Sequence, residues 1–141
     1  MIITRRNALT LLGAGAAATA FGSPAVLAQA KKPQVGIVVK IGGIPWFNAM
    51  EVGIKKAAEQ YGADAWMIGP TQADAAQQVS AIEDLIARKV DVIGIVPNDA
   101  AALEPVCKRA QAAGIKVLTH ESPEQKQNDW DFELTTIKAY G

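Results

Sequence analysis

The residues able to bind a polar ligand lie in short stretches that directly follow apolar runs. The first stretch, residues 40–48, contains Lys40, a pair of glycines, and the adjacent aromatic residues Trp46 and Phe47. Aromatic rings stack on the C–H faces of sugars and leave the hydroxyl groups free for polar partners. Phe47 also fits the apolar stripe of the helix that follows, so both core packing and ligand contact are open for it. Trp46 lies off that stripe, which favours ligand contact.

A second polar stretch is His120-Glu121-Ser122. The carboxylate of Glu121 would accept charge-assisted hydrogen bonds from ligand hydroxyls. The alternative is that Glu121 is a solvated loop acid and Lys40 a plain surface lysine. A third stretch, Asn98-Asp99, follows another apolar run, and we expect Asp99 to cap a helix there rather than to bind ligand.

Motifs of catalysis are absent from the sequence. It contains no G-x-S-x-G, P-loop, H-E-x-x-H or C-x-x-C pattern. The only histidine is His120 and the only cysteine is Cys107, so a zinc site has few candidates and an intrachain disulfide is impossible. Cys107 is expected to be a small buried apolar residue rather than a reactive thiol. The 14 basic and 14 acidic residues balance, which argues against nucleic-acid binding. We therefore expect that the protein is not an enzyme and that it has no cofactor and no metal site.

Strands and helices alternate along the chain and must position these stretches. Short β-branched runs predict strands at residues 35–39, 65–68, 92–96 and 115–119, with a fifth at 132–135. Between them, helices are predicted from Pro45 to a stop at Gly62, over 72–89, and from Asn98 or Asp99 to Gly114. Their expected apolar stripes are Phe47, Met50, Ile54, Ala58 and Tyr61; Ala75, Val79, Ile82 and Ile86; and Leu103, Val106, Cys107 and Ala110.

This alternation predicts an α/β fold, a doubly wound parallel sheet with helices on both faces. Ligands of such sheets bind beyond the carboxyl ends of the strands, near the point where the strand order reverses. We therefore expect the ligand site among residues 40–47, 69–72, 97–99 and 120–122.

The first thirty residues have the pattern of a secretory signal. Arg5 and Arg6 are followed by no charged residue until Lys31, and Ala28-Gln29-Ala30 fits an A-x-A cleavage site. The arginine pair resembles a twin-arginine export signal, although the match is partial and the general secretory route stays open. An uncleaved membrane anchor is the other alternative, disfavoured by the glycines and by Pro24. Residues 1–30 are thus expected to be a signal peptide that directs the protein to the periplasm.

The rest of the sequence resembles the type I periplasmic sugar-binding proteins of ABC transporters, the ribose-binding kind. The resemblance rests on residues 35–40 followed by Pro45-Trp46-Phe47, on residues 91–99 and 102–106, and on residues 113–119. It is closest to the autoinducer-2 and rhamnose-binding branch, in which a lysine at the position of Lys40 contacts ligand. The family usually has two phenylalanines at Trp46-Phe47, and an aspartate at the position of Glu121.

This resemblance implies a solute-binding component of an ABC uptake system. It would capture a sugar or sugar-like molecule, such as rhamnose or autoinducer-2, and act as a monomer that docks on a membrane permease. The implied ligand-binding residues are Lys40, Trp46, Phe47, His120 and Glu121. The alternatives are a ligand-presenting sensory or chemotaxis binding protein, or a doubly wound α/β enzyme.

The resemblance also has consequences for the extent of the chain. Family members have two α/β lobes that clamp the ligand between them, and residues 31–141 resemble a truncated N-terminal lobe without the second lobe. An incomplete lobe exposes a helix-docking surface and half a cleft. We therefore expect weak or absent ligand binding by this piece alone, and a tendency to aggregate.

Overall fold

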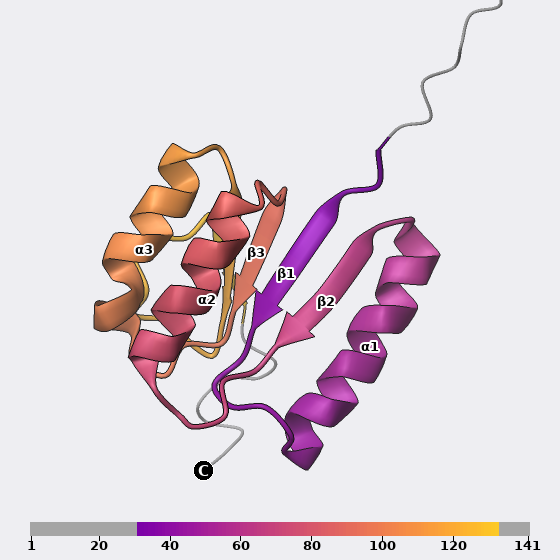
Figure 1. The fold of residues 1–141 in the computed structure, drawn as a ribbon, viewed down its shortest axis with the longest axis horizontal. Helices are drawn as coiled ribbons and strands as arrows, with labels where there is room; N and C mark the ends of the chain where they lie inside the picture. Colours follow the sequence, from indigo (N-terminus) through magenta and orange to yellow (C-terminus); the bar gives the residue numbers. More distant parts are fainter. Residues whose placement is uncertain (1–30, 133–141) are drawn as a thin grey trace, which may run out of the picture. The chain divides into compact units, whose positions relative to one another are not determined.

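The computed structural model describes residues 31–132, which form a five-stranded parallel sheet flanked by helices (Figure 1). The elements in order are β1 (Gln34–Val38), α1 (Pro45–Tyr61), β2 (Asp64–Ile68), α2 (Ala75–Ala87), β3 (Val92–Ile95), α3 (Ala100–Ala112), β4 (Lys116–His120) and β5 (Trp130–Phe132). The strand order is β2-β1-β3-β4-β5, and every neighbouring pair is parallel. The predicted fold class is confirmed, and the strand order reverses between β1 and β3.

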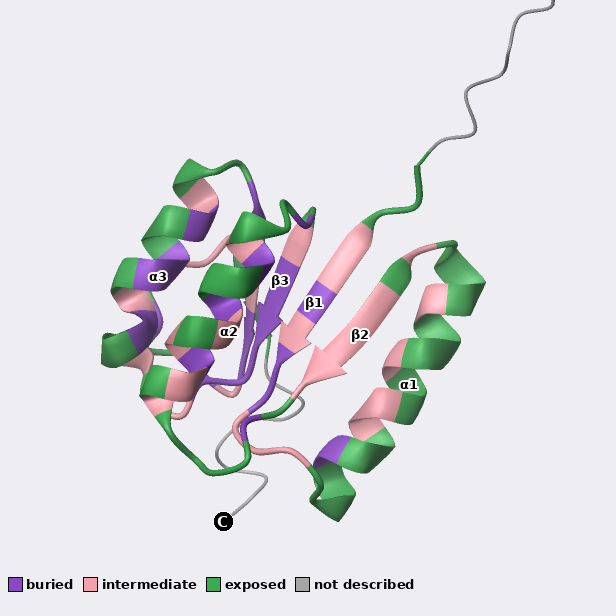
Figure 2. Cartoon of the chain, viewed as in Figure 1, coloured by how far each residue is buried: buried purple, intermediate pink, exposed green. Residues whose placement is uncertain are grey.

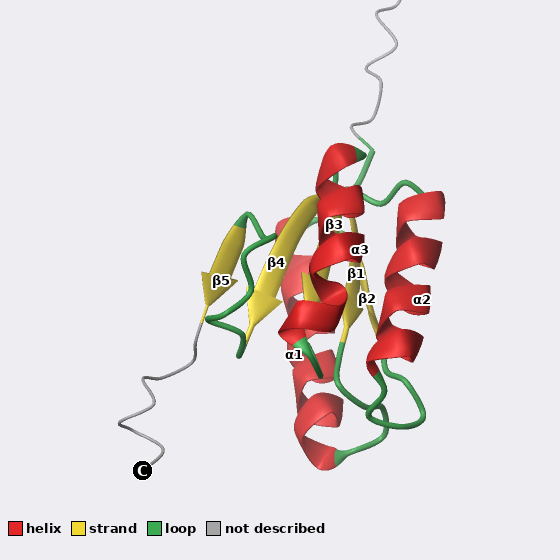
Figure 3. Ribbon diagram, turned by 90° about the vertical axis from the view of Figure 1, so that its left-hand side faces the viewer, coloured by secondary structure: helices red, strands yellow, loops and turns green. Residues whose placement is uncertain are grey.

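The helices lie on both faces of the sheet. Helices α2 and α3 cover one face, and α1 lies on the other (Figures 1 and 3). The larger core lies between the sheet and the α2–α3 pair and includes Ile82, Leu85, Ile93 and Val106. A smaller cluster of Val39, Phe47 and Val96 packs beneath the start of α1. The two faces of the sheet differ in burial, as Figure 2 shows. Buried residues line α2, α3 and β3, whereas α1 has one buried residue.

The ends of the helices follow from local sequence. Helix α1 begins at Pro45 and is closed by Gly62, whose φ of 68° is readily adopted by glycine, and both ends are as predicted. Helix α2 begins at Ala75, three residues later than predicted, because Asp74 is extended and its side chain accepts the Ala76 N–H. Asp99 caps α3 by accepting the Ala102 N–H at 3.1 Å, which confirms the predicted cap.

The buried residues of the three helices agree with the predicted apolar stripes to different extents. All four residues of the α3 stripe are buried, as expected. On α1 the prediction for Tyr61 is wrong, because its side chain is 77% exposed at the last residue of the helix. On α2 the buried residues are Gln78, Ile82 and Leu85, while Val79 and Ile86 are only partly buried. The buried face of α2 is therefore rotated slightly from the predicted one and includes a polar residue.

The sheet is covered unevenly on the α1 side. Within residues 31–132, α1 contacts β2 and leaves the same face of β3, β4 and β5 without a helix. The result is an apolar groove lined by residues that include Ile37, Met50, Ile54, Leu118 and Phe132. Among the helices of residues 31–132, none combines the length and the apolar character that a membrane span requires.

Two predictions concern residues outside the described range. The fifth strand begins at Trp130, two residues earlier than predicted, and residues 133–135 of the predicted strand are not described. The predicted signal residues Arg5, Arg6, Ala28 and Ala30 also lie outside the described residues.

Candidate ligand-binding site

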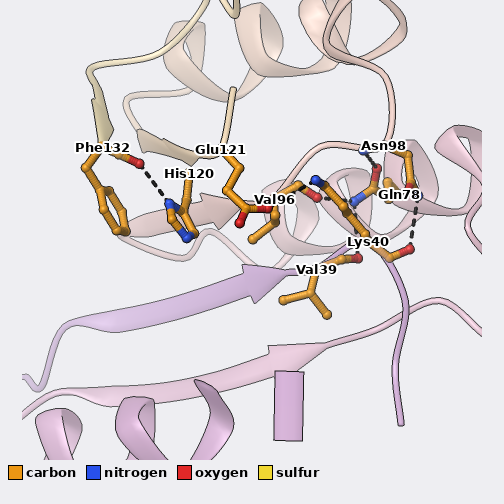
Figure 4. A network of polar contacts seen from close by, with 8 residues as sticks. All are labelled: Val39, Lys40, Gln78, Val96, Asn98, His120, Glu121 and Phe132. Atoms are coloured by element: carbon orange, nitrogen blue, oxygen red, sulfur yellow. Dashed lines mark hydrogen bonds and ion pairs between the residues drawn. The ribbon is translucent and has the colours of Figure 1, made fainter. Parts of the chain in front are cut away.

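The carboxyl ends of β1, β3 and β4 bring three of the predicted polar stretches together. Lys40 follows β1, Asn98 follows β3, and Glu121 follows β4 directly. Because these strands are parallel and adjacent in the order β1-β3-β4, their carboxyl ends meet at one edge of the sheet. Figure 4 shows the side chains that gather there.

Lys40 and Glu121 form an ion pair at this edge. The Lys40 Nζ atom lies 3.1 Å from Glu121 Oε2, and the two side chains are 35% and 30% exposed. A partly exposed pair of this kind contributes at most about 1 kcal/mol to stability. Because both side chains are partly exposed, their polar atoms are accessible to a ligand. The ion pair itself contributes little to the stability of the fold.

The backbone of Glu121 is held in an unusual conformation. Its φ is 56°, in the left-handed region that favours glycine. For a residue with a Cβ atom this conformation costs about 1 kcal/mol. Conformations of this kind cluster at functional sites, where the surrounding structure imposes them. Here the turn directs the carboxylate toward Lys40 as soon as β4 ends.

Trp46 and Phe47 are adjacent in sequence but lie in different environments. Trp46 is 50% exposed in the first turn of α1, and its ring is available for stacking. Phe47 is 3% exposed and packs in the small cluster with Val39 and Val96. Phe47 is thus a core residue, which is one of the two roles that the sequence left open for it, and its contact with ligand stays a prediction.

The loop between β1 and α1, which directly precedes Trp46, packs against the loop after β2. The Gly42 N–H donates to the Pro70 carbonyl at 2.9 Å, and a Cβ atom on Gly69 would overlap the main chain of Gly42. Gly43 has a φ of 78°, a backbone conformation that residues other than glycine rarely adopt. Gly42 and Gly69 thus allow the two loops to approach closely, and Gly43 allows the chain to turn before α1.

His120 does not join the ion pair. Its ring is buried and stacks on Phe132 with ring centroids 4.6 Å apart, and its Nδ1 atom lies 2.8 Å from the Phe132 carbonyl oxygen. A carbonyl oxygen only accepts, so Nδ1 carries the proton. His120 and Trp46 line one surface depression between α1 and β5, together with Phe132. The structure therefore brings together Lys40 with Glu121, and Trp46 with His120.

No role was predicted for Gln78 from the sequence, and Asn98 was predicted to lie near the site without a role for its side chain. Gln78 is fully buried on α2 and its carboxamide bonds the main chain beyond both β1 and β3. Asn98 lies in the stretch 97–99 that was predicted to border the ligand site and to cap a helix, and its side chain donates to the Lys40 carbonyl at 3.0 Å. The spacing in the sequence could have identified Gln78. It lies four positions before Ile82 and therefore on the buried face of α2.

Polar contacts hold the edge strand β5 in place beside the site. The carboxylate of Asp129 accepts the Val117 N–H at 2.8 Å and the Lys116 amine at 3.0 Å. These contacts, the Val117 N–H first, hold the pKa of the Asp129 carboxyl below its ordinary value. The Thr119 hydroxyl donates a hydrogen bond to the Asp131 carboxylate at 2.6 Å.

The remaining candidate for reactivity, Cys107, is inert by its surroundings. It is fully buried in the core beneath α3, and burial raises the pKa of its thiol to about 12. At neutral pH it is a neutral thiol without solvent access, and it packs as the small apolar residue that the sequence predicted.

Comparison with known proteins identifies the family. Residues 35–141 match the periplasmic binding protein domain family. The ribose import binding protein RbsB of Bacillus subtilis is 31% identical over 70% of this chain and 32% of its own length. The D-xylose-binding periplasmic protein of Escherichia coli is 33% identical over 77% of this chain and 32% of its own.

Solved structures agree with these relatives. A solute-binding protein from Burkholderia graminis in complex with D-arabinose has a TM-score of 0.65 and 37% identity, covering 72% of this chain and 35% of that one. One from Clostridium phytofermentas with bound L-rhamnose has a TM-score of 0.61 and 33% identity, covering 64% and 28%. The chain spans about a third of the length of the curated relatives that it matches. It belongs to the periplasmic binding protein family, and its relatives there are type I sugar-binding proteins.

Proposed function

We propose that this chain contributes one wall of the ligand cleft in a periplasmic protein that binds a simple sugar for an ABC uptake system. The observation that carries the proposal is the partly exposed Lys40–Glu121 pair at the carboxyl edge of the sheet. Trp46 adds an aromatic ring face. It is half exposed in the first turn of α1, directly after the loop that begins at Lys40.

The chemistry of these side chains suits a sugar. The Lys40 amine donates to a hydroxyl oxygen, and the Glu121 carboxylate accepts a hydroxyl proton. Two neighbouring hydroxyls of one sugar can therefore replace the direct contact between the two side chains. Hydrogen bonds to charged groups are stronger than neutral ones. Stacking on the Trp46 ring would orient the apolar face of the sugar.

The ligands of the relatives support a proposal for the ligand class. Proteins similar to this chain are named for binding ribose and xylose, and solved neighbours carry D-arabinose, L-rhamnose or AI-2. These ligands are small and rich in hydroxyl groups. We infer that the ligand of this protein is a pentose, a deoxyhexose or a sugar-like molecule of similar size.

The protein would be exported to the periplasm and would bind a membrane permease. Residues 1–30 act as the signal peptide, with Arg5 and Arg6 for twin-arginine export and cleavage after Ala28 or Ala30. Residues 31–141 belong to the N-terminal lobe, and a second lobe closes the cleft over the ligand. The loaded protein then docks as a monomer on the membrane permease.

The test is a calorimetric titration of the complete polypeptide that the gene encodes, after the reading frame has been sequenced through and past codon 141. D-ribose, D-xylose, D-arabinose, L-rhamnose and AI-2 form the panel. We expect one of them to bind with 1:1 stoichiometry and Lys40→Met to weaken that binding at least tenfold. Lys56→Met, on the exposed surface of α1, is the matched control. Failure of the whole panel, or equal affinities of the two variants, would contradict the proposal.

A further inference from the structure

The backbone hydrogen bonds between β1 and β3 stop where both strands are still buried. The last bond runs from the Val96 N–H to the Val38 carbonyl at 2.9 Å. Beyond it, Pro97 has no N–H to donate, and the chain after β1 turns toward α1. The carbonyl groups of Val39 and Val96 nevertheless lie in the interior, where unpaired polar groups are costly.

One side chain satisfies these main-chain groups. The Nε2 atom of Gln78 donates to the Val39 carbonyl at 3.1 Å and to the Val96 carbonyl at 2.9 Å. Its Oε1 atom accepts the Asn98 N–H at 2.8 Å. A carboxamide is the only side-chain group that carries an NH2 group with two donor hydrogens and an acceptor oxygen on one carbon atom. Gln78 thus continues the hydrogen bonding of the sheet past its last paired residues (Figure 4).

A second amide extends this connection to the ligand site. The main chain of Asn98 is held by Gln78, and the Nδ2 atom of Asn98 donates to the Lys40 carbonyl at 3.0 Å. From that fixed position the Lys40 side chain reaches Glu121. The contacts therefore run without interruption from the buried face of α2 to the Lys40–Glu121 pair.

We propose that Gln78 is a positioning residue for the ligand site, which acts through Asn98 to fix the main chain of Lys40. The inference rests on the proposed function only where it concerns sugar affinity. The placement of Lys40 relative to Glu121 is a property of the ligand-free protein and can be measured without any sugar.

The experiment compares Gln78→Met and Asn98→Ala with the wild type by NMR on the complete polypeptide in the absence of sugar. Gln78→Met keeps the length of the side chain and removes its three hydrogen bonds. Asn98→Ala removes the bond to Lys40 and leaves Gln78 in place. Gln77→Met is the matched control, because Gln77 is the neighbouring glutamine on α2 but is not fully buried.

We expect Gln78→Met to speed hydrogen exchange at the Asn98 amide at least tenfold, while amides of α3 such as that of Val106 change less than twofold. In both Gln78→Met and Asn98→Ala, the nuclear Overhauser effect between the side chains of Lys40 and Glu121 should fall by at least half. Gln77→Met should alter neither signal. In the complete polypeptide, the best sugar of the panel should bind at least tenfold more weakly to Gln78→Met and at least threefold more weakly to Asn98→Ala.

The outcomes separate this inference from the proposed function. If no sugar binds the wild type, the proposed function fails and the ligand-free NMR signals alone decide the inference. If Gln78→Met does not fold, Asn98→Ala decides it. An unchanged Lys40–Glu121 contact in Asn98→Ala overturns the inference, as does a Gln78→Met variant that lowers only the midpoint of unfolding.

Discussion

The amine of Lys40 lies 3.1 Å from the carboxylate of Glu121, although 81 positions separate the two residues in the sequence. The strands that precede them are not neighbours, because β3 lies between β1 and β4. Two strand spacings amount to roughly 10 Å. Long side chains are needed to bridge that gap, which gives a physical reason for glutamate rather than aspartate at position 121.

The first prediction concerns this pair. Glu121→Gln keeps the shape of the side chain and removes its charge, so we expect sugar affinity to fall about tenfold, as for the loss of a charge-assisted hydrogen bond. The free energy of unfolding should change by less than about 1 kcal/mol, because the pair is partly exposed. Calorimetric titration and urea unfolding measure the two effects. A large loss of stability with unchanged affinity would assign the pair a purely structural role.

The adjacent aromatic residues should respond in opposite ways. Trp46→Ala removes an exposed ring and should weaken sugar binding about fivefold, as expected for the loss of an aromatic stacking contact of about 1 kcal/mol. Phe47→Ala opens a cavity in the cluster with Val39 and Val96 and should lower the free energy of unfolding by about 3 kcal/mol or more. Each variant is the control for the other. Similar losses of stability in both would contradict the assignment.

The acid stability of the protein should depend on Asp129. The pKa of its carboxyl is lower in the folded protein than its ordinary value, chiefly because of the Val117 N–H. Protonation therefore favours the unfolded chain. The stabilisation is complete above the ordinary carboxyl pKa of roughly 4 and is lost as the pH falls through the lower, folded-state pKa.

Asp129→Asn removes this titration. We expect the variant to be less stable at neutral pH and its stability to vary less with pH below about 4 than that of the wild type. Urea unfolding across this pH range makes the measurement, and Asp84→Asn, on an exposed surface of α2, is the control. Parallel pH profiles for Asp129→Asn and the wild type would disprove the prediction.

Cys107 should resist modification while the protein is folded. Its thiol is buried in the core and its pKa is raised to about 12, so the reactive thiolate is scarce and inaccessible. A chromogenic disulfide reagent should react slowly with the native chain and rapidly in denaturant. Rapid reaction of the folded protein would show that α3 separates from the sheet more readily than its packing indicates.

The apolar groove should make residues 31–141 associate when expressed alone. Trp130 and Phe132 are 62% and 53% exposed, and Phe132 lines the groove together with Ile54 and Leu118. Phe132→Ser should lower the apparent mass measured by light scattering after gel filtration at increasing concentration. Tyr61→Ser, at the exposed end of α1, is the control and should leave the mass unchanged. A monomeric wild-type piece would contradict this expectation.

Much of the fold was predictable because it depends on short-range patterns. The start of α1 at Pro45 and its end at Gly62 follow from the backbone restrictions of proline and glycine. The cap at Asp99 follows from the ability of its carboxylate to accept a free N–H. β-branched runs predicted the buried strands, and the alternation of strands and helices predicted a parallel sheet with helices on both faces.

What the sequence determined by itself was therefore the order of the elements, the parallel sheet and the edge at which a ligand site would form. Only the tertiary structure decided which side chains meet there. It placed Phe47 in the core, paired His120 with Phe132, and joined Gln78 to the ends of β1 and β3. The physical reason is that helical and strand periods act over a few residues. Contacts across a sheet depend on the order of the strands, which no local pattern contains.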